Sequence, residues 1–365
     1  MKKFAIATSL ALIFSPVVPT FASGMSIVGT IPTVVETHNP SLMGYAGSQV
    51  KPNIILLQKI ELTPSAQIAF ANRIEKMKQP TPHTFSASAT NDASKLPSKI
   101  DIGMNNVPVL NQGAHGSCVT FAVAGSLDTL IAKGDYVSEL CSLTLGNALE
   151  AKNSNYPSGW NGSIGPIVLK QFFDYGIVSM KNQKEIGCGG LTAYPASNPV
   201  EEGTNTTPKE YSEMSESINN QYEWHSMFSS DIAFIDASYN PKKMLLDVKN
   251  ALNEGVRVTF GVLLDVTYGS NGAVGTHHVR NDTWMLTPAI EDDVINNRVD
   301  AGHEMIIIGY DDDAIVKDNS GHENKGLLTL RNSWSQFAGD HGNYYMSYDH
   351  FKLMALETQV ATEKK

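Results

Sequence analysis

The sequence predicts an α+β protein built from two unlike halves, because helical patterns come first along the chain and strand patterns follow. Apolar residues at helical spacing run from Ser117 to Lys133 and stop at Gly134, a residue type that readily ends helices. Further helical patterns cover residues 143–151, 164–175 and 241–253. Apolar or alternating runs between turn signals then predict strands over residues 256–264, 304–310, 326–331 and 343–348.

Composition and charge narrow the range of functions. The chain has 365 residues, of which 42% are hydrophobic and 18% are charged, as is usual for globular proteins. Its formal net charge of -10 argues against non-specific binding to nucleic acid. We therefore expect a monomer that binds no nucleic acid and has no stable membrane insertion.

The first residues have the pattern of a signal peptide. Met1-Lys2-Lys3 is a short basic start, residues 4–18 are mostly apolar, and small residues surround a cleavage point after Ala22. The apolar run is too short and too interrupted to span a bilayer. We expect residues 1–22 to be removed and the mature chain to be exported, either secreted or periplasmic.

A separate segment follows over residues 23–95. It is predicted to contain an irregular or short-stranded part over 24–52, a strand over 54–62, a helix over 65–77 and a linker over 79–95. The linker is polar and rich in Pro, Ser, Thr and Asn, which predicts a site of proteolysis. We expect the main domain to begin near Leu96.

Three cysteines in an exported chain leave one thiol without a disulfide partner. Cys118 follows a loop that contains Gly113 and Gly116, and it lies in the first turn of the first strong helix. Backbone N–H groups and the positive end of the helix dipole favour a thiolate there, as a nucleophile requires. Gln112 can direct a side-chain N–H to the same point, which with the Cys118 N–H would form an oxyanion hole.

A nucleophilic thiolate also needs a neighbouring imidazole and a group that orients this imidazole. His303 follows Gly302 at the start of an apolar strand pattern. Asn332 ends a later strand pattern, where its amide oxygen can accept from the imidazole N–H and fix the tautomer. Trp334 follows two residues later and can cover that hydrogen bond from water.

In this order, Gln-x5-Cys, Gly-His at a strand start and Asn-Ser-Trp resemble the signature of the papain-like cysteine peptidase family. The resemblance covers about residues 96–351, and the form of the Cys motif is most similar to bacterial members. It implies a helical left subdomain packed on a β-barrel-like right subdomain, with the cleft between them. The peptidase domain would cover residues 96–365, with a mainly helical half over about 96–235 and a mainly β half over 236–365.

The resemblance also implies a role for each residue of the site. Cys118 would be the nucleophile, His303 its base, Asn332 the residue that orients the base and Gln112 the oxyanion donor. A protein or peptide substrate would lie extended along the cleft residues Gly162, Ser163, Gly302 and Trp334. Its carbonyl carbon would be attacked to give an acyl-enzyme that water hydrolyses, with no cofactor and no metal.

The sequence departs from the family pattern at several positions. Val119 stands where Trp is usual, and His115 stands where the family has a cysteine, so the customary disulfide of this loop is absent. Cys141 and Cys188 are left either as a disulfide or as two buried thiols. Residues 269–300 form an insertion that lengthens the spacing from nucleophile to base.

Other features have competing interpretations. We interpret the adjacent His277 and His278 as positions without a metal, and the run Asp311-Asp312-Asp313 as a solvated turn in preference to a calcium site. Residues 24–95 are either a pro-segment that inhibits the cleft until it is cut, or an extension that stays attached. We favour the pro-segment, because the linker is easily cut.

The sequence thus predicts a secreted cysteine peptidase that is made as a zymogen. A catalytically silent binding protein with the same fold is the main alternative. An acyl-transfer enzyme, of transglutaminase-like or amidase type, is a third hypothesis.

Overall fold

The computed structural model describes residues 24–37, 51–78, 96–154, 156–229, 240–267 and 271–364. The predicted signal peptide over residues 1–22 and the predicted linker over 79–95 lie outside the described residues. Within the described part, no helix combines the length and the apolarity that a membrane crossing requires.

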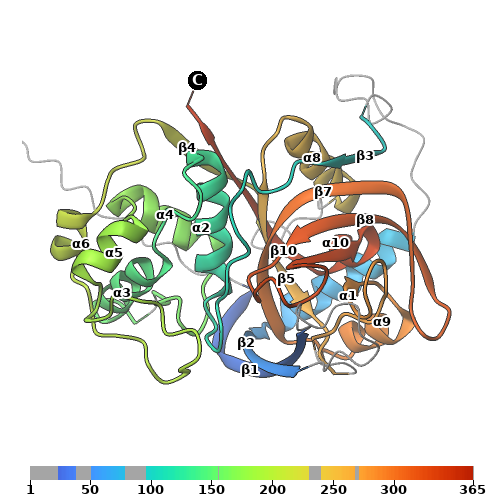
Figure 1. The fold of residues 1–365 in the computed structure, drawn as a ribbon. Helices are drawn as coiled ribbons and strands as arrows, with labels where there is room; N and C mark the ends of the chain where they lie inside the picture. Colours follow the sequence, from blue (N-terminus) through green and yellow to red (C-terminus); the bar gives the residue numbers. More distant parts are fainter. Residues whose placement is uncertain are drawn as a thin grey trace, which may run out of the picture.

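Helices gather on one side of the molecule, at the left of Figure 1. They are α2 (Cys118–Ile131), α3 (Glu139–Glu150), α4 (Gly165–Tyr175), α5 (Met180–Ile186) and α6 (Pro208–Met214). Helix α2 has nearly its predicted bounds and ends at Ala132, which adopts a left-handed conformation with φ 57°. Helix α3 begins earlier than predicted, because the Ser138 hydroxyl accepts from the Cys141 N–H and caps the helix.

A large sheet occupies the other side of the molecule, at the right of Figure 1. Its strands follow the order β4-β10-β5-β7-β8-β9-β6, with β1, β2 and β3 outside this path. They are β1 (Met25–Thr37), β2 (Lys51–Leu62), β3 (Lys99–Asp101), β4 (Tyr222–Ser229), β5 (Val258–Leu264), β6 (Thr283–Trp284), β7 (Ala301–Lys317), β8 (Glu323–Arg331), β9 (Asn343–Ser347) and β10 (Ala355–Glu363). The helices α1 (Pro64–Lys78), α8 (Pro241–Asn253), α9 (Pro288–Ile295) and α10 (Tyr348–Met354) lie on this side. The predicted α+β architecture with a helical and a β half is confirmed.

Two features of the β half involve segments outside its predicted strands. Strand β4, which falls inside the predicted helical half, pairs antiparallel with β10 from Tyr222↔Glu363 to Ser229↔Glu357. The chain therefore crosses between the halves at both of these strands. The predicted insertion over 269–300 contains β6 and α9, so it forms part of the β half's own structure.

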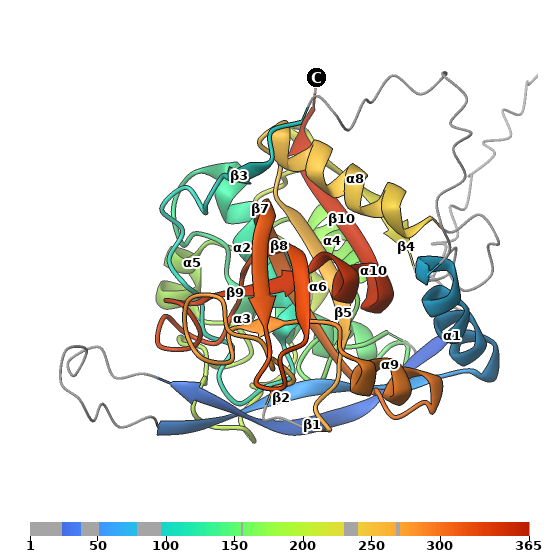
Figure 2. The same ribbon diagram turned by 90° about the vertical axis from the view of Figure 1, so that its right-hand side faces the viewer.

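The N-terminal segment is more regular than predicted. Strand β1 has 13 residues and pairs antiparallel with β2 along its length, from Met25↔Leu62 to Thr37↔Lys51. The prediction of an irregular or short-stranded stretch over 24–52 underestimated the strand Met25–Thr37, because pairing with a partner strand decides its length. Figure 2 shows the hairpin along the lower edge of the molecule, with α1 at its right-hand end.

Residues of this segment belong to the core of the β half. Val35, Leu57, Phe70 and Ile74 are buried in the same apolar cluster as residues of β5, β7 and β10. Arg73 of α1 is also buried, and its Nη1 donates to the carbonyl oxygens of Leu353 and Ala355, both at 2.8 Å. The segment is thus held by apolar burial and by a charged hydrogen-bond donor.

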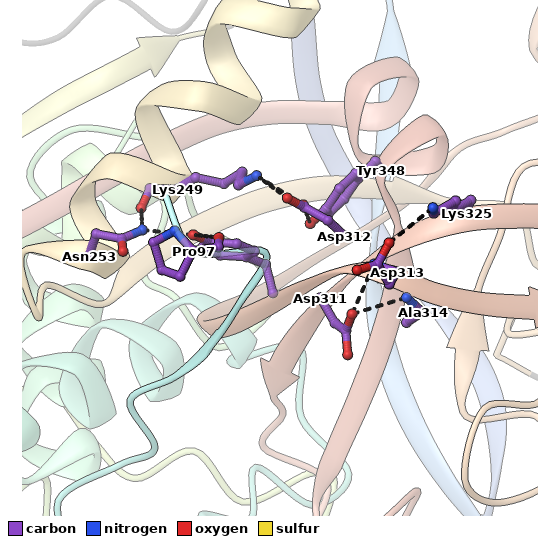
Figure 3. A network of polar contacts seen from close by, with 10 residues as sticks. Pro97, Lys249, Asn253, Asp311, Asp312, Asp313, Ala314, Lys325 and Tyr348 are labelled. Carbon is purple, nitrogen blue, oxygen red and sulfur yellow. Dashed lines mark hydrogen bonds and ion pairs between the residues drawn. The ribbon is translucent and has the colours of Figure 1, made fainter. Parts of the chain in front are cut away.

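A polar network holds the start of the predicted main domain against the sheet (Figure 3). The Tyr310 hydroxyl donates to the Pro97 carbonyl at 2.8 Å. Asp312 accepts from Lys249 Nζ at 2.8 Å and from the Tyr348 hydroxyl at 2.6 Å. All three residues of the acidic run lie in β7, where the register with β8 shifts. Asp311 forms an ion pair with Lys99, and Asp313 forms one with Lys325. They are thus parts of separate ion pairs, where the sequence predicted a solvated turn.

Candidate active site

Cys118 is the first residue of α2 and is fully buried. Its N–H is one of the donors that an α-helix leaves without an intrahelical partner. The preceding loop passes close to other backbone: a Cβ on Gly116 would lie 3.1 Å from Asn161 Cα. A small residue before the helix is therefore required for this approach, as the glycine pattern predicts.

His303 and Asn332 lie within hydrogen-bond distance of each other. His303 Nε2 lies 2.9 Å from Asn332 Oδ1, which also accepts from the Ser333 N–H at 2.8 Å. Because Asn332 Oδ1 is only an acceptor, His303 Nε2 carries the hydrogen and Nδ1 has the lone pair. Within the described residues, His303 Nδ1 has no hydrogen-bond partner.

Trp334 covers the imidazole. Its ring stacks on His303 with centroids 4.6 Å apart and an interplanar angle of 24°. Trp284 and Tyr344 contact Trp334 edge-to-face from the side of the sheet. Trp334 is 1% exposed, so the aromatic ring excludes water from one face of the imidazole.

The thiol and the imidazole come from the two halves of the molecule. His303 lies on β7, opposite Val262 of β5. Desolvation raises the pKa of the Cys118 thiol, and the backbone of the residue after His303, Glu304, acts on the thiol in the opposite direction. The contact of α2 with β7 therefore brings Cys118 to the backbone immediately after His303.

The hairpin of the N-terminal segment reaches this site. Gln58 of β2 is buried, and its Nε2 lies 3.5 Å from Cys118 Sγ. Strand β2 joins β7 by the pairs Gln58↔Gly302 and Lys59↔Ala301. An extended chain thus lies across the thiol and adds to the strand that carries His303.

Three glycines around the thiol are in close contact with this hairpin. A Cβ on Gly162 would lie 2.9 Å from Gln58 Oε1, and a Cβ on Gly302 would lie 2.8 Å from Ile60 Cγ1. A Cβ on Gly116 would lie 3.0 Å from the Thr30 side chain. These glycines leave the space that the hairpin occupies. Two of them, Gly162 and Gly302, are among the four predicted cleft residues. Of the other two, Ser163 is buried next to Gly162 in the sequence, and Trp334 is buried against His303.

Burial governs the charge of both reactive groups. Desolvation raises the pKa of Cys118 to about 12, although hydrogen bonds from Gln58 and Glu304 act in the opposite direction. Desolvation also lowers the pKa of His303 to about 4, against the effect of its bond to Asn332. Under the hairpin, the site therefore holds a neutral thiol and a neutral imidazole at pH 7.

Gln112 is buried and fixed at both ends of its amide. Its Nε2 donates to the His115 carbonyl at 2.9 Å, and its Oε1 accepts from the Ser333 hydroxyl at 2.8 Å. One amide hydrogen of Nε2 is thus committed to the loop, and the second one remains for another acceptor.

Several residues of the site have no strong sequence signal. Gln58 is followed by Lys59 in the predicted strand, and nothing in this pattern singles it out. Glu304 is buried beside Cys118, and the pKa of its carboxyl is raised well above its usual range, first by desolvation and then by Glu357. Tyr194 contacts the loop before Cys118 through two hydrogen bonds and lies in a stretch without a clear pattern.

The remaining candidate ligands are occupied in other ways. Cys141 and Cys188 form a disulfide, which decides between the two alternatives left by the sequence. His277 stacks on His278, and His278 Nδ1 lies 2.8 Å from Asp340 Oδ2. Within the described residues, no group of three or more His, Cys, Asp or Glu side chains could hold a metal ion.

Comparison with known proteins gives structural likenesses only. No protein-family model matches the sequence. No curated protein matches it.

Among solved structures, xylellain, a cysteine protease from Xylella fastidiosa, is similar at a TM-score of 0.45 and 17% identity over 78% of this chain and 95% of that chain. The proform of the ragweed pollen cysteine protease Amb a 11 is similar at 0.44 and 16% identity, over 82% and 76% of the two chains. The bromelain protease from Ananas comosus, in complex with the inhibitor E64, is similar at 0.43 and 17% identity, over 74% and 100%.

Proposed function

We propose that the chain is a cysteine peptidase of the papain-like type, with Cys118 as nucleophile, His303 as base and Asn332 as the residue that orients the base. The observation that carries this proposal is the bond from His303 Nε2 to Asn332 Oδ1 at 2.9 Å. This bond leaves the lone pair of His303 Nδ1 to accept a proton from the thiol. His303 lies on β7, and the backbone of the next residue on that strand acts on Cys118. A helix-terminal thiol and an oriented imidazole are the two groups that nucleophilic catalysis by cysteine requires.

The chemistry follows from these groups. His303 Nδ1 takes the Cys118 proton, and the thiolate attacks the carbonyl carbon of an extended peptide to give a tetrahedral oxyanion. The Cys118 N–H and the second amide hydrogen of Gln112 stabilise that oxyanion. Imidazolium then protonates the leaving amine, and water releases the acyl group from the sulfur.

The proposal includes a zymogen. The hairpin of β1 and β2 holds Gln58 at the thiol, in a site where desolvation keeps both reactive groups neutral. Displacement of the hairpin would admit water, lower the pKa of Cys118 and raise the pKa of His303. Residues 24–78 therefore act as an intramolecular inhibitor, and the predicted linker over 79–95 is the proposed cleavage region.

Export of the chain is part of the same proposal. The predicted signal peptide over residues 1–22 supports it, as does the disulfide between Cys141 and Cys188, which persists in an oxidising compartment.

One experiment tests the reaction. The protein is cut within the linker and the N-terminal segment is separated from it. This processed protein is treated with a papain-directed epoxide and digested to locate the adduct by mass spectrometry. We expect one adduct, on Cys118, and loss of peptide cleavage in Cys118→Ala. An unmodified Cys118 together with undiminished cleavage in the variant would show that another group performs the reaction. An unmodified Cys118 without any cleavage would favour the silent binding protein.

A further inference from the structure

The loop before Cys118 carries both groups that the proposed oxyanion hole needs. Gln112 lies at its start, and the Cys118 N–H lies at its end. The shape of this loop therefore decides whether the two donors converge on one point. The loop has no disulfide of its own, because residues 112–117 contain no cysteine and Cys118 is a free thiol.

One hydroxyl connects the two ends of the loop. The Tyr194 hydroxyl lies 2.7 Å from the Gln112 carbonyl oxygen and 2.9 Å from Ser117 Oγ. A carbonyl oxygen only accepts, so Tyr194 donates to Gln112, and Ser117 donates to Tyr194. Burial raises the pKa of Tyr194, so its phenol keeps this proton at all ordinary pH values.

The two residues after Tyr194 also bind the loop. His115 Nε2 donates to the Pro195 carbonyl at 3.1 Å, and the Ala114 N–H donates to the Ala196 carbonyl at 2.9 Å. Gly113 has φ 57°, and a Cβ there would lie 1.9 Å from the Ala196 oxygen. The backbone of residues 194–196 thus follows the loop so closely that one loop position must be glycine.

Aromatic contacts hold the Tyr194 ring. It lies parallel to Trp160, with centroids 5.7 Å apart and an interplanar angle of 5°. Phe121 of α2 contacts the ring edge-to-face at 4.9 Å, and His115 contacts it in the same way at 5.5 Å. With the ring held on these sides, the place of the hydroxyl is defined.

We propose that Tyr194 is a positioning residue for the peptidase reaction: its hydroxyl fixes Gln112 relative to the Cys118 N–H and so sets the geometry of the oxyanion hole. This inference rests on the proposed function and assigns it a residue outside the reacting groups. Loss of the hydroxyl would leave substrate binding along the cleft intact, because the hydroxyl bonds the loop and not Gly162 or Gly302. It would weaken the interaction that forms only in the transition state.

The test compares Tyr194→Phe with Tyr211→Phe in the processed protein. Tyr211 is the matched control, because its buried hydroxyl donates to the Gly176 carbonyl at 3.1 Å in the same half and away from the loop. Each variant loses one hydroxyl and keeps its aromatic ring. The kinetic constants kcat and KM for a peptide substrate, the affinity for a peptide aldehyde and the thermal midpoint are measured for both.

We expect Tyr194→Phe to lower kcat about tenfold and to leave KM within about twofold. The affinity for the peptide aldehyde should also fall about tenfold, because the aldehyde adduct carries an oxyanion. Tyr211→Phe should lower the thermal midpoint without these changes. Ser117→Ala removes the hydrogen bond between Ser117 and the Tyr194 hydroxyl and should lower kcat about threefold. This variant replaces Tyr194→Phe in the test if Tyr194→Phe does not fold.

Two results would overturn the inference, and they are distinguishable. Equal kcat and aldehyde affinity in Tyr194→Phe, Ser117→Ala and Tyr211→Phe, in an active enzyme, would reduce Tyr194 to a structural residue. Absence of peptide cleavage in the processed wild-type protein would remove the proposed function and this inference with it.

Discussion

Gln58 Nε2 lies 3.5 Å from Cys118 Sγ, although the two residues are 60 positions apart in the sequence. The glutamine comes from a hairpin that pairs with β7, and the thiol comes from the first turn of α2. The side chain donates a hydrogen bond to the buried sulfur. A residue of the N-terminal segment therefore contacts the proposed nucleophile.

Replacement of Gln58 should expose the thiol. We expect Gln58→Ala to increase the rate at which iodoacetamide alkylates Cys118 in the full chain by at least about tenfold, because water enters and the pKa of the thiol falls. Gln67→Ala is the control, since Gln67 bonds Leu62 on the same segment and is remote from the thiol. Equal alkylation rates in the two variants would mean that the backbone of β2, and not Gln58, protects the sulfur.

The N-terminal segment should remain bound after the linker is cut. Its apolar side chains lie in the core of the β half, and Arg73 bonds two carbonyls there. We expect a protein cut at an engineered site in residues 79–95 to elute as one complex from size-exclusion chromatography under native conditions. Separation of the fragments at once after cleavage would contradict this.

Arg73→Met provides the energetic test of that anchor. It leaves the Leu353 and Ala355 carbonyls without their donor and should lower the free energy of unfolding by about 2–4 kcal/mol. Lys78 lies on the same helix as Arg73 and forms an exposed ion pair with Glu291 of α9. Lys78→Met removes this pair and should change the free energy of unfolding little. Both are measured by denaturant unfolding of the full chain. Similar losses in the two variants would rule out a special role for the buried guanidinium.

Glu304 should make stability depend on pH. Its buried carboxyl has a pKa raised well above 4.5, so the folded chain retains a proton that the unfolded chain releases. Stability from this group is then lost as the pH rises above about 4.5, by at most about 1.4 kcal/mol per pH unit. Glu304→Gln stays neutral and should reduce the slope of stability against pH between pH 5 and 8, measured by denaturant unfolding. The control is Glu185→Gln on the surface of α5, which should leave the slope as in the wild-type protein. An unchanged slope in Glu304→Gln would show that the Glu304 carboxyl is ionised in the folded chain.

Asn332 should affect the reaction through His303. Asn332→Ala removes the acceptor that fixes the imidazole tautomer and should lower kcat/KM by about 10–100-fold, the equivalent of one charge-assisted hydrogen bond. Asn324→Ala, which loses bonds to the Leu286 backbone, is the control for a general loss of stability. Peptide cleavage by the processed protein measures both. Wild-type kcat/KM in Asn332→Ala would exclude the proposed role of Asn332.

Part of the fold was predictable because its signals are local. Helix α8 has its predicted bounds, Pro241–Asn253, because Asn240 caps it and Pro241 begins it. Strand β7 was predicted over 304–310 but extends over Ala301–Lys317, since its polar end pairs with β8 and lacks an apolar pattern of its own. Strand β1 has no clear sequence signal because most of its side chains are not buried.

The sequence by itself determined the local chemistry: a cysteine at the start of a helix after a glycine loop, a histidine that enters a strand and an asparagine that ends another. These features depend on backbone conformation within a few residues, which residue types control directly. Only the tertiary structure decided that Gln58 covers the thiol, that Cys118 and His303 are neutral beneath it, and that Tyr194 connects the ends of the loop. Each of these depends on desolvation or on a hydrogen bond between distant segments, and such contacts arise only when the chain is packed.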